Sequence, residues 1–213
     1  MSEKISKIIK ASFEESENLQ LNYMEDVKKD LSRWFLLSVE YQPLITLGRR
    51  LSQSPELEKW KIPKHDVVFT DRGGEATIHN PGQLVIYPIF HLPSYGFTVK
   101  SYVHQLEACL ISLLESYGIS GHRVCQRPGI FTDRGKIASI GIRVQRGISK
   151  HGLSLNVCND LKNFKKISCC GVEQSTVDSM ENYVSSLDLN LVNSKFQKIL
   201  IEKIFNYEEI NSQ

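Results

Sequence analysis

RGGEATIHNPGQ, residues 72–83, is the stretch from which the fold of this chain can best be predicted. Its adjacent glycines let the backbone adopt positive φ or approach a ligand closely, and its Pro-Gly pair is a second turn signal. Apolar runs at 67–69 and 84–89 flank it and predict strands. A polar, turn-rich segment between two strands is typical of a binding loop. A Gly-Gly pair alone, however, indicates an ordinary loop with a salt-bridged Arg72 equally well.

The composition is that of a soluble globular protein and predicts one domain over residues 1–213. Hydrophobic residues make up 41% of the chain and charged residues 23%, and the net charge is only +2, so the overall balance does not indicate nucleic-acid binding. No apolar run approaches the ~18 residues of a membrane span. The cysteines are odd in number and lack CxxC spacing, which predicts a reduced, cytoplasmic protein without a zinc site. They are Cys109, Cys125, Cys158, Cys169 and Cys170.

The first third of the chain alternates between helical and strand-like patterns. Residues 1–13 are predicted to form an arm or a short helix. From residue 14 to about residue 33, apolar side chains recur every three or four positions, which predicts a helix. The segments 35–40 and 44–47 alternate like strands on either side of a Gln-Pro pair and predict a hairpin. The polar segment 49–65 contains two prolines and is predicted to be a surface loop.

The clearest helix is predicted at 98–117, where one apolar stripe ends at a glycine. Residues 136–144 and 152–157 both alternate like strands, and the glycine-containing turn between them predicts a second hairpin. One or two helices are expected at 176–207. Strands and helices are mixed without a βαβ rhythm, so the predicted fold class is α+β.

Two residues are candidates for chemistry. Cys170 precedes a glycine, so a turn can present its sulfur beside backbone N–H groups that hold an oxyanion, although a lone cysteine is more often a small buried apolar residue. Lys136 begins a predicted strand, where a lysine is usually solvated; as a neighbouring cation it would favour a thiolate and then move its proton. His79 and His151 are rival bases, and either can be structural. No catalytic triad order, P-loop or zinc-protease motif stands out.

The segment 122–150 is strongly basic. Such a segment is usually a solvated face, but here we interpret it as a docking surface for an acidic partner, centred on the strand that begins at Lys136. Its charged residues are Arg123, Arg127, Arg134, Lys136, Arg143, Arg146 and Lys150, against Asp133.

Three separate stretches resemble the lipoyl(octanoyl) transferase family in order and spacing. They are EYQPLITLGRR at 40–50, RGGEATIHNPGQLVIYPI at 72–89 and KIASIGIRVQRGISKHGLSLNV at 136–157. The family's Cys-Gly signature matches Cys170-Gly171, and the resemblance extends from about residue 35 to residue 185. It implies a mixed sheet flanked by helices, which is the catalytic-domain fold of biotin protein ligases and lipoate-protein ligases.

Members of this family move an octanoyl group from octanoyl-acyl carrier protein to a lysine of lipoyl domains in 2-oxoacid dehydrogenase and glycine cleavage proteins. The resemblance implies that Cys170 is the nucleophile that carries the acyl group as a thioester, and that Lys136 is its partner. No metal, cofactor, nucleic acid or membrane is expected to take part. The substrate-lining residues that match the family are Arg72, Gly73, Gly74, Glu75, Ala76, Thr77, Ile78, His79, Ser139, Ile140, Gly141, Gly152, Leu153 and Ser154.

Two positions depart from the family pattern. Asn80 stands where the family usually has glycine, and we expect positive φ there because asparagine tolerates a left-handed backbone better than other non-glycine residues. Cys169 stands where the family usually has proline, and of the two adjoining thiols we assign the reactive one to Cys170, beside Gly171. Two other functions stay open: an ATP-dependent lipoate or biotin ligase of the same fold, and a non-catalytic protein that binds an acyl carrier or nucleic acid.

Overall fold

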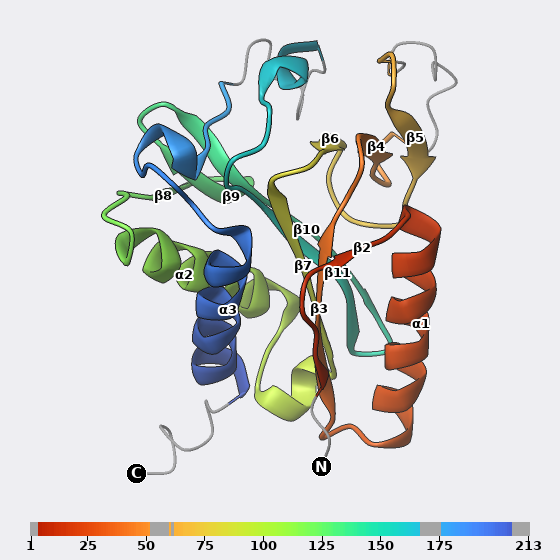
Figure 1. Cartoon of the computed structure of the whole chain (residues 1–213). Coiled ribbons are helices and arrows are strands. Elements are labelled where there is room, and N and C mark those ends of the chain that lie inside the picture. The colour runs from red at the N-terminus through yellow and green to blue at the C-terminus, as the bar shows by residue number, and fades with distance from the viewer. Residues whose placement is uncertain (1–3, 52–59, 61, 167–175, 206–213) are drawn as a thin grey trace.

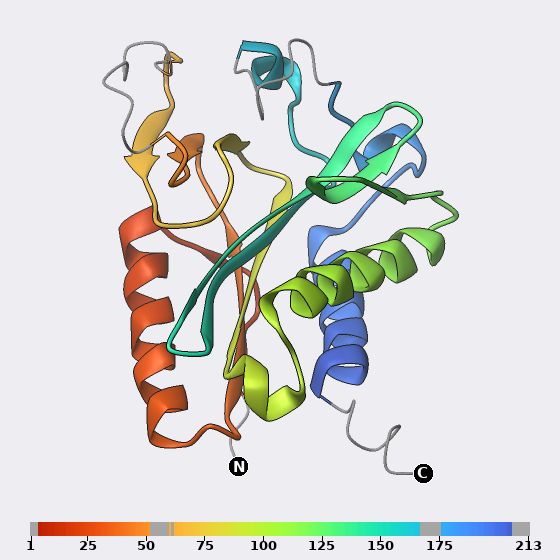
Figure 2. The same ribbon diagram turned by 180° about the vertical axis from the view of Figure 1, so that it is seen from behind.

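A large mixed sheet forms the centre of the structure, a computed structural model that describes residues 4–51, 60, 62–166 and 176–205 (Figure 1). Helix α1 (Phe13–Lys29) covers one face of the sheet, and α2 (Val99–Glu115) and α3 (Leu189–Leu200) cover the other (Figures 1 and 2). The predicted α+β class is thereby confirmed. In spatial order the strands are β1 (Lys4–Ile5), β3 (Trp34–Glu40), β7 (Gln83–Phe90), β11 (Ile148–Asn156), β10 (Gly135–Gln145), β9 (Arg127–Thr132) and β8 (His122–Val124), with β2 (Ile9–Lys10) also paired to β3.

A second, smaller sheet contains β5 (Asp66–Phe69), β4 (Leu44–Leu47) and β6 (Ala76–His79). Strand β4 runs parallel to β5 and antiparallel to β6. The predicted hairpin between 35–40 and 44–47 is therefore wrong. One edge of β3 pairs with β1 and β2 and the other edge pairs with β7, so β3 offers no free edge to β4, which pairs in the second sheet instead.

The N-terminal segment, predicted as an arm or a short helix, also differs from expectation. Its described part forms the two short strands β1 and β2, which pair in parallel with β3 at Ile5↔Leu36 and Ile9↔Val39. This pairing covers the backbone groups of an edge that would otherwise stay open to other chains. The sequence pattern did not reveal it because each strand has only two residues.

The helices predicted at 14–33 and 98–117 are both present, as α1 and α2, and each begins at a capping box. Ser12 and Glu15 exchange side-chain-to-backbone hydrogen bonds at the start of α1, and Thr98 and Ser101 do so at the start of α2. Helix α1 ends at Lys29, about one turn earlier than predicted. Within the described ranges, no helix combines the length and the apolar character needed to cross a membrane.

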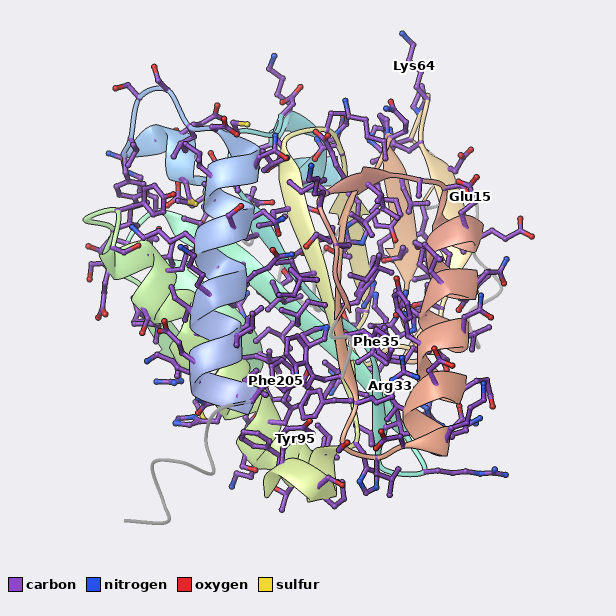
Figure 3. The ribbon with its side chains drawn as sticks, turned by 60° about the horizontal axis from the view of Figure 1, so that its bottom comes forward. Glu15, Arg33, Phe35, Lys64, Tyr95 and Phe205 are labelled. Atoms are coloured by element: carbon purple, nitrogen blue, oxygen red, sulfur yellow. The ribbon has the colours of Figure 1, made fainter. Side chains whose placement is uncertain are left out.

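Apolar side chains pack on both faces of the large sheet. On the side of α2 and α3, Phe205 stacks on Trp34 with ring centres 4.2 Å apart and meets Tyr95 at 5.5 Å (Figure 3). On the side of α1, Tyr23 stacks on Phe35 at 4.4 Å. Strand β7 lies between these two cores and is buried along its whole length. A strand buried on both faces needs a continuous apolar sequence, which explains the run at 84–89.

The predicted second hairpin is confirmed as β10–β11. Arg146 and Gly147 form its turn with φ of 51° and 80°, the positive values that a two-residue hairpin turn requires. The predicted surface loop at 49–65 is described only in part. There, Ile62 is buried in the core of the small sheet beside Ile45, so this part of the segment packs inward.

The expectation of positive φ at Asn80 is wrong. Gly82, with φ of 87°, adopts the left-handed conformation in this turn instead. The side chain of Asn80 is buried, donates to the carbonyl of Asp160 at 2.6 Å and accepts from Nδ2 of Asn159 at 2.9 Å. Asparagine therefore serves this position through its amide group rather than through backbone freedom.

Replacing Gly82 with alanine should lower the free energy of unfolding more than the same change at Gly118. Both glycines have positive φ, 87° and 71°, which costs another residue roughly 1–2 kcal/mol. At Gly82 the added Cβ would also lie 2.9 Å from the backbone of Cys158 and Asn159, whereas at Gly118 it would meet no atom within 4 Å. Urea unfolding of both variants measures the difference. Equal losses would show that the close approach at Gly82 is of no consequence.

Candidate functional site

A pocket lies between the two sheets, lined by the segment 72–79 and by residues of β7, β10 and β11. Its lining includes Lys136 and all but one of the substrate-lining residues predicted from the sequence. The exception is Ile78, which is 0% exposed and packs in the core of the small sheet. Thr77 and His79 line the pocket, so the residue between them on β6 faces the opposite way. Ile78 was expected in the lining because the sequence pattern did not predict strand β6, in which neighbouring side chains face opposite ways.

Two sets of hydrogen bonds hold the segment 72–79 in place over the large sheet. The amide of Gly73 donates to the carbonyl of Ile142 on β10 at 2.9 Å. The guanidinium of Arg72 donates to the carbonyl and the hydroxyl of Thr46 at 2.6 Å and 2.9 Å, and to the carbonyl of Glu75 at 2.7 Å. Arg72 therefore braces the loop against the small sheet, while Gly73 ties the loop to the large sheet.

His79 is buried beneath this loop and is neutral near pH 7, because burial lowers the pKa of its imidazole to about 4. Its Nδ1 lies 2.7 Å from Oε1 of Gln83, an oxygen that can only accept, so Nδ1 carries the proton. Its Nε2 then accepts from the hydroxyl of Thr46 at 3.3 Å. Both ring nitrogens are engaged, which favours a structural role for His79 over the role of a base.

Lys136 reaches the pocket from β10 across Gly129 of the neighbouring strand. A Cβ at Gly129 would lie 2.8 Å from Cε of Lys136, so the lysine occupies the space that a larger residue would fill. Its Nζ lies 5.5 Å from the centre of the Phe131 ring, and the guanidinium carbon of Arg127 lies 4.8 Å from the same centre. Arg127 also lines the pocket, which therefore has two cations beside one aromatic ring.

Cys170 and its neighbour Cys169 lie outside the described residues. The described chain resumes at Thr176, beside Lys136. The amide of Lys136 donates to the carbonyl of Thr176 at 2.9 Å, and Val177 forms a parallel bridge with Lys136. The stretch of sequence that contains Cys170 is thus followed directly by residues attached to the lysine with which we pair it.

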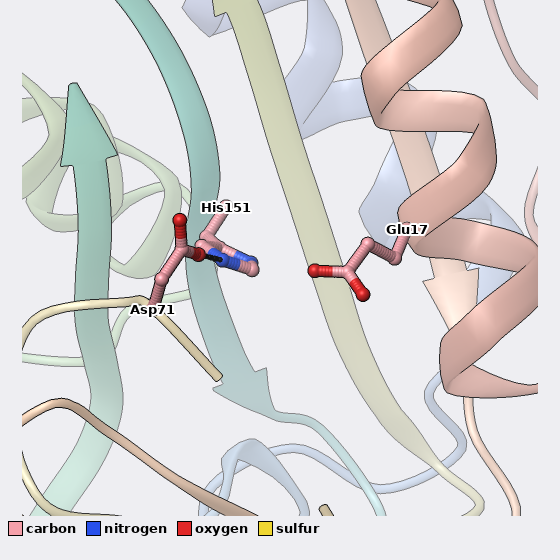
Figure 4. Close-up of side chains that lie close together, drawn as sticks. All are labelled: Glu17, Asp71 and His151. Atoms are coloured by element: carbon pink, nitrogen blue, oxygen red, sulfur yellow. Dashed lines mark hydrogen bonds and ion pairs between the residues drawn. The ribbon is translucent and has the colours of Figure 1, made fainter. Parts of the chain in front are cut away.

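A group of charged and polar side chains connects α1 and β11 with Asp71, the residue that precedes Arg72. Asp71 and His151 point toward one another, with Oδ1 and Nε2 2.6 Å apart, and Glu17 of α1 faces them (Figure 4). The spacing of these three groups would suit a metal ion. The ammonium of Lys150, however, lies 2.7 Å from Oε1 of Glu17 and 3.3 Å from Oδ1 of Asp71, so it supplies the positive charge that a metal would bring.

Protonation in this group follows from its hydrogen bonds. The hydrogen bond from His151 holds the pKa of Asp71 well below its usual value, and the charge of Lys150 acts in the same direction. Burial lowers the pKa of His151, against the opposing effect of Asp71. The ring is therefore neutral near pH 7, and its Nε2 carries the proton that Asp71 accepts.

His151 departs from the regular alternation of its strand, which the sequence pattern did not predict. With φ of 59° it has a left-handed backbone within β11. It pairs with Ile142, which packs in the core under α2 and α3, so in a regular strand its side chain would face that core. Instead the ring lines the pocket and stacks on Phe13 with centres 6.4 Å apart. His151, proposed as a rival base, forms part of the pocket wall.

The basic segment 122–150 contains both buried and exposed charged side chains. Lys150 is buried and paired with Glu17 and Asp71, and Nε of Arg143 lies 4.0 Å from Asp71 as well. Arg146 occupies the β10–β11 turn, roughly 30 Å along the strand from Lys136. Lys150 is therefore no part of a docking surface, because it is buried and paired, whereas docking at Arg143 and Arg146 stays a prediction.

Residues 13–203 match the family model of the lipoyl protein ligase A/B catalytic domain. Similar curated proteins are named octanoyltransferase. That of Halorhodospira halophila is 46% identical over 138 residues, which cover 65% of this chain and 61% of that protein. That of Persephonella marina is 33% identical over 202 residues, which cover 94% of this chain and 97% of that protein. The chain thus spans less than two thirds of the first relative and nearly all of the second.

Solved structures of similar fold include lipoate and biotin ligases. A bipartite lipoate protein ligase of Thermoplasma acidophilum superimposes with a TM-score of 0.75 at 13% identity, over 95% of this chain and 84% of that chain. The biotin protein ligase of Aquifex aeolicus, in complex with biotin and ATP, gives a TM-score of 0.51 at 14% identity, over 78% of this chain and 72% of that chain. At these identities the likeness concerns the fold alone, and it confirms the predicted mixed sheet flanked by helices.

Asp71→Asn should lower the stability of the fold at neutral pH. In the folded protein the pKa of Asp71 is held below its unfolded value of about 3.9, so its ionised form stabilises the fold above that value. As pH falls below about 4 this contribution fades, and the difference between wild type and variant should shrink. Thermal unfolding over a pH series measures it, with Asp133→Asn, exposed in the β9–β10 turn, as the control. A difference that persists unchanged in acid would contradict the assignment.

Proposed function

The chain belongs to the octanoyltransferases of the lipoyl protein ligase A/B catalytic domain family, and we propose that it carries the octanoyl group as a thioester on Cys170. Octanoyl transfer in protein lipoylation, an acyltransferase activity, follows from this membership. The proposal adds the nucleophile, the proton carrier and the donor, octanoyl-acyl carrier protein. The observation that carries it is that Lys136 lines the pocket and is hydrogen-bonded to Thr176, which follows the segment containing Cys170.

The reaction proceeds in two steps. A thiolate, not a thiol, attacks a thioester, and the cation of Lys136 favours that form of Cys170. Attack on the acyl carbon breaks its bond to the carrier's sulfur, which takes the proton of Lys136 and leaves as a thiol, and the octanoyl group stays on the enzyme with Lys136 now neutral. The amine of the acceptor lysine then attacks the new thioester, forms an amide and loses a proton, which Lys136 accepts in its neutral form. The two thioesters have similar energies, whereas the amide is more stable and draws the sequence forward.

The acyl chain lies along the pocket, from Lys136 toward a wall of aromatic rings. Lys136 and Gly141 are five positions apart on β10, roughly 16 Å of strand, and Gly141 pairs with the residue after His151. The rings of Phe13 and Tyr87 have their centres 6.4 Å and 6.2 Å from that of His151, and all three residues line the pocket. Each methylene buried there contributes roughly 0.8 kcal/mol. A slot of fixed length therefore selects chain length.

The donor approaches the end of the pocket where Arg127 and Lys136 lie beside the ring of Phe131. Two adjoining cations suit an acidic carrier protein, and rim charges act mainly on the association rate. The acceptors are lipoyl domains of 2-oxoacid dehydrogenase and glycine cleavage proteins. A structural neighbour, the archaeal lipoate protein ligase, is described together with its E2 lipoyl domain, which supports this acceptor class. A cytoplasmic location completes the proposal.

The alternative function is that of an ATP-dependent lipoate or biotin ligase. Such an enzyme forms an adenylate and needs no cysteine nucleophile. The curated relatives named octanoyltransferase favour the transferase over the ligase. Release of pyrophosphate on addition of ATP and lipoate would support the ligase instead.

Cys170→Ser should abolish the octanoyl thioester, whereas Cys169→Ala should retain most of the activity. Intact-mass analysis after incubation with octanoyl-acyl carrier protein measures the adduct. In wild type the mass should rise by one octanoyl group and return to the starting value when a lipoyl domain is added. Adduct formation by Cys170→Ser together with its loss in Cys169→Ala would move the nucleophile to the neighbouring residue.

Lys136→Ala should fold normally and transfer far more slowly, because general acid–base help typically supplies ~10²–10⁴-fold. Cys170 of this variant should also react more slowly with an alkylating agent at neutral pH, since its thiolate loses a neighbouring cation. Lys100→Ala, an exposed change on α2, is the control. An unchanged alkylation rate across the pH range would show that Lys136 does not favour the thiolate.

A further inference from the structure

The carboxylate of Asp178 is buried, with 0% of the residue exposed, and four groups donate to it. Its Oδ1 accepts from Nδ2 of Asn182 at 2.7 Å and from the amide of Ser179 at 2.9 Å. Its Oδ2 accepts from the hydroxyl of Tyr183 at 2.7 Å and from that of Thr132. A buried charge is tolerated only where such donors replace water, so the position of this carboxylate is closely specified.

The backbone around Asp178 is attached to Lys136. The amide of Asp178 donates to the carbonyl of Lys136 at 3.0 Å, and the amide of Lys136 donates to the carbonyl of Thr176 at 2.9 Å. Asn156, which lines the pocket, donates from Nδ2 to the carbonyl of Asp178 at 3.0 Å. The segment 176–178 is therefore bonded to both backbone polar groups of Lys136 and to the pocket lining.

A carboxylate can accept from all four of the groups that surround Asp178, which an amide cannot. Burial alone would raise its pKa, but the hydrogen bonds from Thr132, Asn182, Tyr183 and the amide of Ser179 hold that pKa below its usual value, so the group is ionised near pH 7. Asparagine has nearly the same shape but only one oxygen. Its NH₂ group would face the hydroxyls of Thr132 and Tyr183, which would have to turn and accept, and the stronger hydrogen bonds to an ionised group would be lost, which would displace the segment.

We propose that Asp178 is a positioning residue for octanoyl transfer, in which its carboxylate holds the segment 176–178 against β10 and so fixes Lys136 at the pocket. The inference rests on the proposed role of Lys136. Asp178 is absent from the described lining of the pocket, so it acts through Lys136 and has no direct effect on the bound acyl chain. Neither the motifs nor the strand pattern single it out, because its attachment to Thr132 and Lys136 joins residues that are far apart in the sequence.

Asp178→Asn should lower kcat for transfer from octanoyl-acyl carrier protein to a lipoyl domain roughly 10- to 100-fold, since a catalytic group displaced by about 1 Å loses activity on that order. KM for the donor should change less than about twofold. Asp188→Ala is the matched control. The carboxylate of Asp188 caps α3 by accepting from the amides of Asn190 and Leu191, so its loss lowers Tm without a contact to the site, and kcat should stay unchanged.

A double-mutant cycle separates positioning from general damage. In the Lys136→Ala background, Asp178→Asn should cause no further loss of transfer, because the group that it positions is already gone. Thr132→Val, which removes one donor and keeps the shape, should give a smaller fall in kcat with the same sign. Additive losses, or wild-type kcat in Asp178→Asn, would overturn the inference. Wild-type activity of Lys136→Ala alone would instead overturn the proposed function.

Discussion

The brace formed by Arg72 is the interaction on which the pocket depends. A loop that passes between two sheets must find partners for its backbone carbonyls, because an unpaired buried carbonyl costs about as much as a lost hydrogen bond. The planar guanidinium donates from all three of its nitrogens: Nη2 to the carbonyls of Thr46 and Glu75, Nη1 to that of Gly73, and Nε to the hydroxyl of Thr46. A lysine, with its single nitrogen, would not reproduce this geometry. The loop is thereby held at a fixed height above β10, and the space beneath it is the pocket.

From this brace a chain of hydrogen bonds continues to the start of β10, where Lys136 lies. Its members, in order, are Arg72, Thr46, His79, Gln83, Asn156 and Asp178. Each side chain is oriented by the next, so the loss of one leaves a neighbour without its hydrogen-bond partner. The loop over the pocket and the end that holds Lys136 belong to different sheets, yet one network fixes the geometry of both.

The segments that line the pocket could be predicted from the sequence because turn signals and strand alternation are local. Ser139, Ile140 and Gly141, for example, stand in a stretch that alternates like a strand and matches the family's substrate-lining residues, and all three line the pocket. The failures concern choices made by distant parts of the chain. Strand β4 pairs outside the large sheet because other strands already cover both edges of β3. Asn80 has ordinary φ because its amide finds partners around residue 160. Neither the pairing of β4 nor the contacts of Asn80 produce a periodic pattern in the sequence.

The left-handed backbone of His151 shows how distant contacts override a local pattern. This conformation costs roughly 1–2 kcal/mol, and contacts with α1 and with Asp71 offset it. Its amide donates to Gln20 at 2.8 Å, its ring donates to Asp71 and its face stacks on Phe13. The ring therefore lies in the pocket wall instead of the core, and its hydrogen bond connects Asp71 to β11. The loop is thus held at both sheets without help from an acyl chain. A pocket formed in advance loses little conformational freedom on binding, so more of the energy of each buried methylene remains to discriminate between chain lengths.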